Sequence, residues 1–422
     1  MSAELLPVTS TPLVQTEEGL TLDGVPLVAL ARRWGTPLYV YSAEVIRQNL
    51  AAWQDALAPR SHLICYAVKA NHNPHLLAEL VRLGAGFDIV SGGEFELVRA
   101  AGAPASRVVF SGVGKRDDEL EFALAEGIGT INVESASELR KLAAIAARMG
   151  VQAPVALRVN PDVDPRTHPY IATGLHENKF GIGMEEAFAL YREAATEPAI
   201  SLVGVACHIG SQLTELTPLE DAADRVMMLV RRLAEANIEL GVIDLGGGIG
   251  IDYDGETPPT PRAFADAMRA RVPDRYTLKV EPGRSIAGPA GVLLSEVLVV
   301  KENEAGKRFV VVDAAMNDLM RPSLYGATHR IRGLLEHAGA PKQCDVVGPV
   351  CETGDFLARD VLLAAEEGDL VAVSEAGAYG YVMASNYNVR TRPPEIWLDS
   401  SEPICSRRRE TLADLRALDQ IS

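Results

Sequence analysis

A lysine follows a continuous apolar run in the first quarter of the chain. The stretch HLICYAVKAN, residues 62–71, is mostly apolar up to Val68, continues into Lys69 and ends in a polar turn. Such a run is typical of a buried parallel strand, which would deliver the lysine to the carboxyl edge of a sheet. Partial removal from water disfavours an ammonium ion and frees a nucleophilic amine that can condense with an aldehyde cofactor. Taken alone, Lys69 fits a solvent-facing strand end better, so the assignment depends on the rest of the chain.

Two further motifs could hold other parts of such a cofactor. The stretch DLGGGIG, residues 244–250, has three consecutive glycines, whose backbone N–H groups can approach a phosphate, although a tight turn explains them equally. It lacks the spaced glycines of a dinucleotide site, which favours a single phosphate. Glu281 in EPGRSI could keep a ring nitrogen protonated, or it could form a salt bridge with Arg284. The residues alone leave both roles of Glu281 open.

Histidine and cysteine occur in two other polar motifs. His208 in CHIGSQ follows an apolar run and could lie against a planar cofactor while Ser211 reaches its phosphate, although most lone histidines are structural. Cys351, beside Glu352 in GPVCETGD, lies in a predicted turn, which is a poor place to bury a thiol. The 5 cysteines show no C-x-x-C spacing, and no metal site is predicted.

Apolar, β-branched runs alternate with segments of helical periodicity over about 220 residues. The predicted strands are 62–68, 86–90, 107–110, 129–133, 153–159, 202–207, 241–245 and 277–281, and the predicted helices are 92–101, 117–126, 135–149, 185–196, 217–237 and 261–272. This alternation favours a closed (β/α)₈ barrel, in which the chemistry lies at the carboxyl ends of the strands. Nearly every predicted strand ends at a polar residue or glycine.

The pattern changes after Arg284. Residues 286–400 contain β-rich stretches with Gly and Pro turns, which predict a mainly β domain. Residues 1–36 have no strong period and are predicted to form an extended arm that adds to this domain. The expected fold class is therefore α/β, with a barrel domain over 37–285 and a β-domain built from 1–36 and 286–422.

Composition restricts the partners and the compartment. The formal net charge of -17 argues against nucleic acid and anionic membranes, because both would repel the chain. The first residues, MSAELLPVTS, lack a basic segment followed by an apolar core, and no apolar run is long enough to span a membrane. Scattered cysteines fit a reducing compartment. We expect a cytoplasmic protein with a small-molecule substrate.

Taken together and in this order, six motifs resemble the fold-type III pyridoxal-phosphate decarboxylases: YAVKAN, HIGSQ, GGG, EPGR, CETGD and AYGYVMASNYN. The resemblance runs from about residue 20 to 400 and is specific because of the conjunction. It implies an alanine-racemase-like barrel with a β-domain, pyridoxal 5′-phosphate as cofactor, and a homodimer whose active sites are shared across the interface. Two small departures, Ala315 and Thr353, leave the catalytic residues as they are in the family.

The resemblance also implies roles for individual residues. Lys69 would bind the cofactor covalently, His208 would stack on its ring, and Glu281 would face the ring nitrogen. The remaining cofactor contacts would come from Asp88, Arg158, Ser211, Gly248, Gly283, Arg284 and Tyr379. Cys351 would be the proton donor, and the substrate would be bound by Glu352, Arg284, Arg321, Tyr325 and Tyr379.

The implied reaction is decarboxylation of meso-2,6-diaminopimelate to L-lysine and CO₂. Two arginines at the far end of the substrate suit a second carboxylate better than a bare diamine. Related racemases place an arginine at the ring nitrogen, so Glu281 argues against a racemase. A decarboxylase of another basic amino acid, of the ornithine or arginine type, and a catalytically inactive regulatory homologue remain alternatives, because the pocket stretch 166–181 cannot be interpreted in enough detail.

Overall fold

The computed structural model describes residues 7–164, 179–336, 338–399 and 402–420. Its contacts divide the chain into two compact units. Unit 1 is formed mainly by Arg47–Gly250 and Thr257–Ser285, and unit 2 by Val8–Ile46, Ile251–Glu256 and Ile286–Ser422. Each unit is described separately below.

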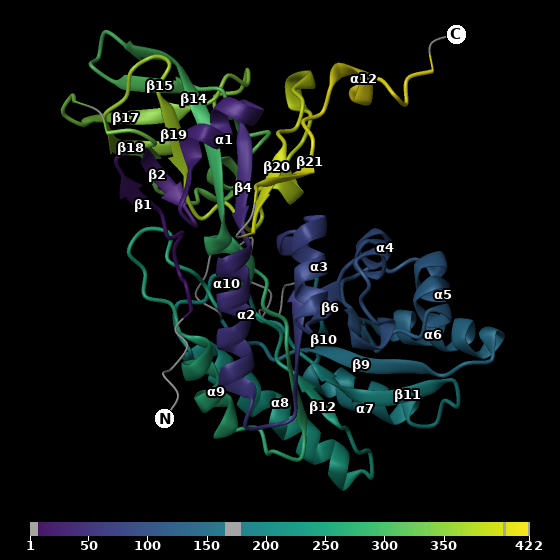
Figure 1. Ribbon diagram of the computed structural model, residues 1–422. Helices are drawn as coiled ribbons and strands as arrows, with labels where there is room; N and C mark the ends of the chain where they lie inside the picture. The colour runs from purple at the N-terminus through teal and green to yellow at the C-terminus, as the bar shows by residue number, and fades with distance from the viewer. Residues whose placement is uncertain (1–6, 165–178, 337, 400–401, 421–422) are drawn as a thin grey trace. The chain divides into compact units, whose positions relative to one another are not determined.

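Unit 1 contains a closed barrel of eight parallel strands (Figure 1). Around the barrel the order is β5 (His62–Ala67), β6 (Gly86–Ile89), β7 (Val108–Phe110), β8 (Thr130–Val133), β9 (Ala153–Asn160), β11 (Ile200–Ala206), β12 (Val242–Asp244) and β13 (Thr277–Val280). The barrel closes where Leu278 of β13 pairs with His62 of β5. The short β10 (Ile182–Gly183) adds to β9 outside this circle. The eight predicted strands and the predicted fold class are confirmed.

One helix precedes the first barrel strand and the others follow the strands, as expected of a (β/α)₈ fold. They are α2 (Ala43–Leu57), α3 (Pro74–Arg82), α4 (Gly92–Ala100), α5 (Asp117–Ala125), α6 (Ala136–Met149), α7 (Met184–Ala194), α8 (Thr217–Glu235), α9 (Pro261–Arg269) and α10 (Arg284–Ala287). Figure 1 shows α4, α5 and α6 side by side on the outside of the barrel.

Several helix starts are fixed by side-chain caps that the sequence supplies. Ser135 accepts a hydrogen bond from the Glu138 N–H at the start of α6, and Ser91 caps α4 in the same way. Thr260 caps α9, which begins with Pro261. Each cap satisfies a backbone donor that the helix itself cannot satisfy. Because these caps directly follow strand ends or loops, they hold the polar edge of the barrel in a fixed geometry.

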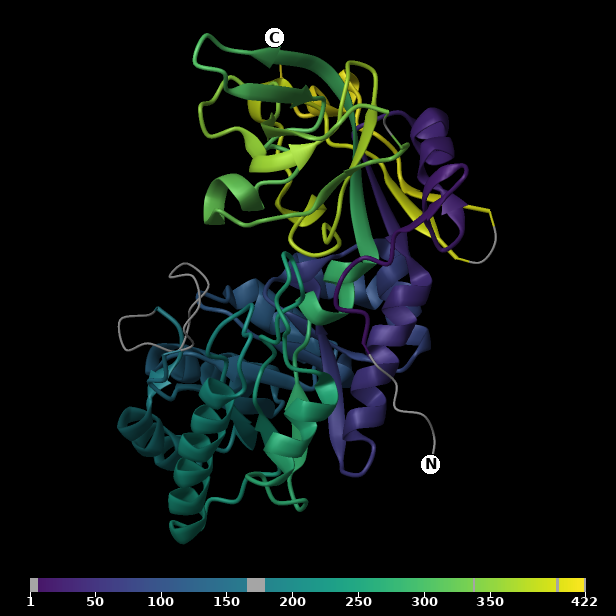
Figure 2. The same ribbon diagram turned by 90° about the vertical axis from the view of Figure 1, so that its left-hand side faces the viewer.

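Unit 2 is built around the 12-residue strand β14 (Gly291–Glu302), drawn in green in both ribbon views (Figures 1 and 2). Its main sheet has the order β18 (Phe356–Leu363), β17 (Lys342–Val347), β15 (Arg308–Val312), β14, β4 (Leu38–Ser42), β20 (Glu395–Leu398) and β21 (Ile404–Arg407). β19 (Leu370–Val373) pairs with β14 and with β16 (Ile331–Gly333). Two short helices, α11 (Arg321–Tyr325) and α12 (Leu412–Leu415), complete the unit.

The N-terminal segment differs from its predicted form. It contains β1 (Val14–Thr16), β2 (Gly19–Leu22) and β3 (Val25–Pro26), followed by the helix α1 (Leu27–Trp34), so the prediction of a wholly extended arm was wrong. Leu27, Leu30 and Ala31 of α1 are buried with residues of β4 and β14. The helix forms because packing of this apolar face outweighs its short length. β4 also pairs with β14, and unit 2 includes residues up to Ile46.

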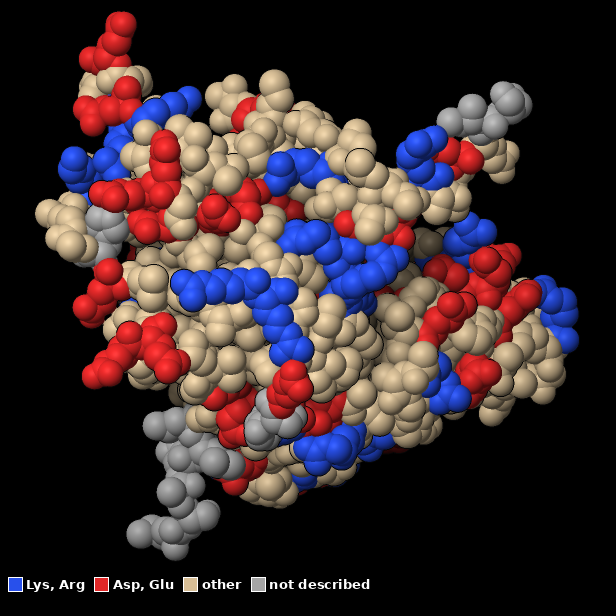
Figure 3. Space-filling model, turned by 45° about the horizontal axis from the view of Figure 1, so that its top comes forward, with Lys and Arg blue, Asp and Glu red and all other residues tan. Residues whose placement is uncertain are grey.

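The surface carries both signs of charge. Figure 3 shows lysine and arginine side chains between aspartate and glutamate side chains on the face that it presents. Among the described residues, no helix has the length and apolar character needed to cross a membrane.

Candidate active site

Lys69 lies in a single 3₁₀ turn, Val68–Ala70, immediately after β5. Its Nζ donates a 2.7 Å hydrogen bond to Oδ2 of Asp88, which lies one residue before the end of β6 and is fully buried, while the Lys69 side chain is 37% exposed. The neighbouring strands bring the two side chains together, since Ala67 pairs with Asp88 across the ladder. The lysine and the carboxylate form an ion pair at this edge of the barrel. A proton must leave Lys69 before its amine can act as a nucleophile.

Arg158, two residues before the end of β9, forms a buried ion pair. Its Nη1 lies 2.9 Å from Oε1 of Glu134, which follows β8. The Glu134 carboxylate also accepts hydrogen bonds from the backbone N–H groups of Gly112 and Gly181. The Arg158 guanidinium lies 4.8 Å from the centre of the Phe180 ring. These contacts fix the cation at the carboxyl edge of the barrel.

Glu281 and Asp244 form a buried pair of carboxyl groups. Glu281 follows β13, and Asp244 ends the neighbouring β12. Burial raises the pKa of Glu281 well above its usual range, and the negative charges of Asp244 and Asp88 raise it further. Oε1 of Glu281 is buried and has no hydrogen-bond partner among the described residues. A donor or cation placed against this oxygen would satisfy it.

The three glycines after Asp244 adopt backbone positions that a side chain would prevent. Gly248 has φ +104°, and a Cβ there would lie 2.4 Å from the Gly210 carbonyl oxygen. A Cβ on Gly247 would lie 2.1 Å from the carbonyl oxygen of Glu281. The glycine turn therefore packs directly on the EPGR turn. A Cβ on Gly283, which lies in the EPGR turn, would be 3.0 Å from the Cβ atoms of Ala67 and Ala70.

His208 lies beside the glycine turn, where its Nδ1 accepts a 3.4 Å hydrogen bond from the Gly247 N–H. Burial lowers the pKa of the imidazole well below its usual range, and the cations of Arg158 and Lys69 lower it further. The ring is therefore neutral near pH 7. The nearby Arg284 Nη2 donates a 3.0 Å hydrogen bond to Oγ of Ser211.

Unit 1 thus brings together nine of the predicted site residues at the carboxyl end of its barrel: Lys69, Asp88, Arg158, His208, Ser211, Gly248, Glu281, Gly283 and Arg284. Unit 2 carries the other five, which are Arg321, Tyr325, Cys351, Glu352 and Tyr379.

Cys351 is exposed on the turn between β17 and β18, in agreement with the predicted loop-mounted thiol. Its N–H donates a 2.9 Å hydrogen bond to Oδ1 of Asn388. The two Asp355 oxygens accept hydrogen bonds of 2.7 Å from the N–H groups of Met316 and Val350. The turn is therefore held from two other segments of unit 2.

Arg321 is the first residue of α11, and Tyr325 is the last residue of the same helix. The Arg321 side chain is largely buried, and its Nη1 lies 2.8 Å from Nε2 of His329. Its guanidinium lies 4.4 Å from the ring centre of Tyr253. A spacing of four residues puts Arg321 and Tyr325 on one face of the helix.

Sequence reasoning missed some residues around these groups. Glu94 lies near Lys69 and Asp88, and burial raises its pKa to about 7. His329 and Tyr253, which contact Arg321, were also not predicted. The position of Glu94 five residues after the end of β6 was an available signal for the first of these. No local pattern marks the other two.

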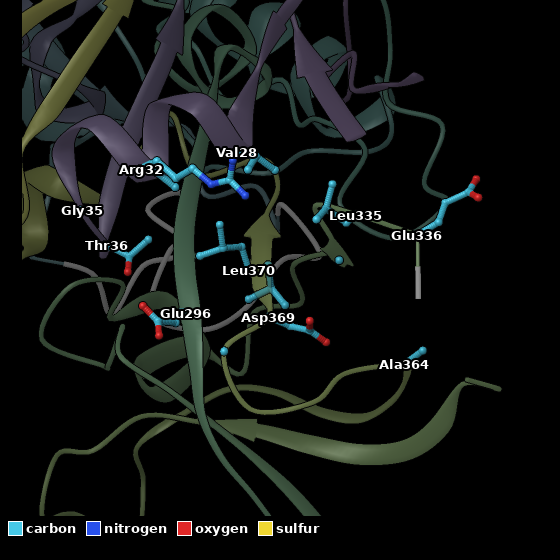
Figure 4. A pocket seen from close by; sticks show the side chains of 14 residues that line it. Val28, Arg32, Gly35, Thr36, Glu296, Leu335, Glu336, Ala364, Asp369 and Leu370 are labelled. Atoms are coloured by element: carbon cyan, nitrogen blue, oxygen red, sulfur yellow. The ribbon is translucent and has the colours of Figure 1, made fainter. Parts of the chain in front are cut away.

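Other features bear on the remaining predictions. Within the described part of the chain, no group of three or more His, Cys, Asp or Glu side chains could hold a metal ion. A cavity of about 330 Å³ in unit 2 is lined by residues such as Arg32, Glu296 and Asp369, and by none of the predicted site residues (Figure 4). Most of the predicted pocket stretch 166–181 lies outside the described residues.

Comparison with known proteins gives the family. Residues 43–288 match the family described as "Pyridoxal-dependent decarboxylase, pyridoxal binding domain". The diaminopimelate decarboxylase of Pseudomonas aeruginosa is 53% identical over 94% of this chain and 96% of its own length. This chain belongs to the pyridoxal-dependent decarboxylase family. The predicted family is confirmed.

Two solved structures of the family show how close different branches are. Diaminopimelate decarboxylase from Helicobacter pylori, complexed with L-lysine, is 42% identical, with a TM-score of 0.90 over 93% of this chain and 98% of its own. Lysine/ornithine decarboxylase from Vibrio vulnificus, complexed with putrescine, is 25% identical, with a TM-score of 0.78 over 89% of this chain and 98% of its own. The chain is therefore more similar to the former than to the latter.

The described residues fit the cofactor for which the family is named. Lys69 supplies an amine at the barrel edge, and the buried Oε1 of Glu281 lacks the partner that a protonated ring nitrogen would provide. The approach of Gly248 to the Gly210 carbonyl leaves no space for a side chain, which is typical of a backbone that cradles a phosphate. Reactive amine, carboxyl and glycine turn all follow strands of one barrel.

Proposed function

We propose that this chain decarboxylates meso-2,6-diaminopimelate to L-lysine and CO₂, with pyridoxal 5′-phosphate bound through Lys69. The observation that carries the proposal is the buried Glu281 carboxyl, with an unsatisfied oxygen, at the same barrel edge as Lys69. The similarity to diaminopimelate decarboxylases, at 53% identity for the Pseudomonas aeruginosa protein, supports the choice of substrate.

When pyridoxal phosphate is bound, its ring supplies an electron sink for the pair of electrons that remains when CO₂ leaves. Glu281, as a carboxylate, would hold a protonated ring nitrogen of the cofactor. Burial and the neighbouring carboxyl groups raise the pKa of Glu281, because they destabilise its negative charge. A cation beside Oε1 would stabilise that charge. Asp88 forms an ion pair with Lys69 while the lysine is an ammonium ion.

The neutral His208 would lie against the cofactor ring and would add no positive charge there. Backbone groups of the glycine turn, together with Ser211, Gly283, Arg284 and Tyr379, bind the phosphate. Arg158 stays fixed by Glu134 beside the cofactor. These residues orient the cofactor and exclude water.

At the far end of the substrate, Arg321, Tyr325 and Arg284 bind the second carboxylate, and Glu352 binds the distal amino group. Arginine is suited to a carboxylate because its guanidinium offers several donors in one plane. Ornithine has no carboxylate at that end. Arg321 therefore favours diaminopimelate over an ornithine-type substrate.

Cys351 returns the proton that replaces CO₂. Its thiol is exposed on a turn that Asn388 and Asp355 hold in place, which leaves it accessible to a substrate. In this proposal the enzyme is a homodimer, and Cys351 and Glu352 act in the partner's site. Free cysteines throughout the chain fit a cytoplasmic location.

The decisive experiment combines a visible spectrum with a turnover assay. The purified protein should show a long-wavelength absorbance band that borohydride bleaches and that Lys69→Ala lacks. It should release CO₂ from meso-diaminopimelate faster than from ornithine or arginine. A preference for either of the latter would reject the proposed substrate, and a normal band without turnover on any of them would indicate a regulatory homologue.

A further inference from the structure

His329 is buried in unit 2 and has a defined tautomer. Its Nδ1 lies 2.8 Å from the backbone carbonyl oxygen of Ser374, which only accepts hydrogen bonds, so Nδ1 carries a proton. Its Nε2 lies 2.8 Å from Nη1 of Arg321, which only donates. Nε2 must therefore be the acceptor. Both contacts are satisfied only by the neutral imidazole with its proton on Nδ1.

This neutral ring orients Arg321 in a particular way. A hydrogen bond to a neutral nitrogen fixes the guanidinium and leaves its positive charge as it is, whereas a carboxylate at the same place would neutralise much of that charge. Arg321 is 5% exposed and His329 is 1% exposed, so water competes little for the contact.

Tyr253 holds the guanidinium from another side. Its ring centre lies 4.4 Å from the Arg321 guanidinium and 5.2 Å from the His329 ring, at an interplanar angle of 77° to the latter. An aromatic face attracts a cation without neutralising it. The imidazole and the aromatic face both fix the cation and preserve its charge.

Hydrogen bonds of neighbouring residues hold Tyr253 and His329 relative to one another. Arg330, next to His329, donates a 2.6 Å hydrogen bond to Oδ1 of Asp252, which precedes Tyr253. Ser374 N–H donates to the Arg330 carbonyl, extending the pairing of β16 with β19. Four segments of unit 2 thus meet around one guanidinium.

We infer that His329 is a positioning residue that prepares Arg321 to bind the carboxylate at the far end of the substrate. The inference rests on the proposed function, in which Arg321 binds that carboxylate. It adds that selectivity for a substrate with a second carboxylate depends on a neutral histidine that touches neither substrate nor cofactor.

Two diamines separate this role from general structural support. L-lysine keeps the far carboxylate of diaminopimelate, whereas 1,5-diaminopentane has the same two amino groups on the same five-carbon spacing and no carboxylate. Calorimetric titration of the cofactor-loaded enzyme with each compound measures how much of the binding depends on the carboxylate.

His329→Ala should weaken the binding of L-lysine about tenfold, which corresponds to about 1.4 kcal/mol, and should leave 1,5-diaminopentane within about twofold. His329→Gln, whose amide oxygen can accept from Arg321, should restore most of the difference. His62→Ala removes a partly buried histidine of the barrel unit, whose Nδ1 lies 2.9 Å from the Arg60 carbonyl oxygen, and serves as the matched control, for which both dissociation constants should stay at the wild-type values. Cofactor absorbance and the melting temperature verify that each variant is folded.

Equal weakening of both compounds by His329→Ala would overturn the inference, since it would indicate a merely structural role. So would unchanged binding of L-lysine, failure of His329→Gln to restore it, or a wild-type enzyme that does not bind L-lysine. A wild-type enzyme that binds L-lysine but releases no CO₂ from meso-diaminopimelate would refute the proposed function instead, and the comparison of the variants would still decide the role of His329.

Discussion

Replacing Glu281 by glutamine tests the electrostatic part of the proposed function, because it removes a carboxylate and keeps the size of the side chain. Glu281 is 9% exposed, and Oε1 has no hydrogen-bond partner among the described residues, so the carboxyl is poorly solvated. Two unit charges about 4 Å apart interact by about 4 kcal/mol at an effective dielectric constant of about 20. Since about 1.4 kcal/mol corresponds to a tenfold change in rate, kcat should fall about 10³-fold.

The assay is CO₂ release at saturating meso-diaminopimelate, with cofactor content measured by absorbance so that loss of cofactor is not mistaken for loss of rate. Glu138→Gln is the matched control, because Glu138 is also a buried carboxylate of the barrel unit and pairs with Lys115 at 2.7 Å. This control should lower the free energy of unfolding and leave kcat unchanged. If Glu281→Gln with full cofactor content keeps more than about a tenth of the wild-type kcat, the charge at this position is not what drives the reaction.

Three other predictions concern the phosphate cradle, the proton donor and a buried carboxyl. Gly248→Ala should raise the dissociation constant for pyridoxal phosphate, measured by equilibrium dialysis, more than about tenfold, because the new Cβ would lie 2.4 Å from a backbone oxygen. Gly127→Ala is the control, since Gly127 has φ +74° but no atom within 4 Å of such a Cβ, and it should leave this constant unchanged. Equal effects of the two substitutions would refute the steric argument. Cys351→Ala should lower kcat about 10²-fold with the cofactor still bound, and an unchanged rate would mean that another group donates the proton that replaces CO₂. Mixing Cys351→Ala subunits with Lys69→Ala subunits should restore part of the activity. Burial raises the pKa of Asp318 from 3.8 to about 7. The favourable contribution of the protonated carboxyl to the free energy of unfolding is therefore complete below about pH 4 and is lost as the pH rises through 7. In urea unfolding over this range the wild type should lose stability relative to Asp318→Asn, by about 1.4 kcal/mol for each unit of pKa shift; parallel profiles would contradict this.

The barrel could be predicted because its strands have a strong local signal. Parallel strands buried on both faces appear as continuous apolar runs, and the helices between them have a clear period. The helix α1, Leu27–Trp34, could not be predicted in the same way. Its eight residues are too few to show a period, and its stability comes from packing against strands that are distant in sequence.

The candidate site shows the same division between local and long-range information. Lys69 and Glu281 could be singled out because each follows an apolar strand and the chemistry of a cofactor requires them. The raised pKa of Glu281 depends on burial and on the nearby charge of Asp244, neither of which is visible in the sequence. His329 has no motif around it, and its contact with Arg321 follows from the tertiary fold alone.

The pairing of β13 with β5 also determines when the site can first exist during synthesis. Leu278 must meet His62 before the circle of strands is complete, so Lys69 waits for about 200 further residues to leave the ribosome before Glu281 can join it. At about 5–20 residues per second, this interval is roughly 10–40 s. Until the last barrel strand emerges, the nascent chain presents a sheet edge with unpaired backbone N–H and C=O groups and cannot hold its cofactor between lysine and carboxylate.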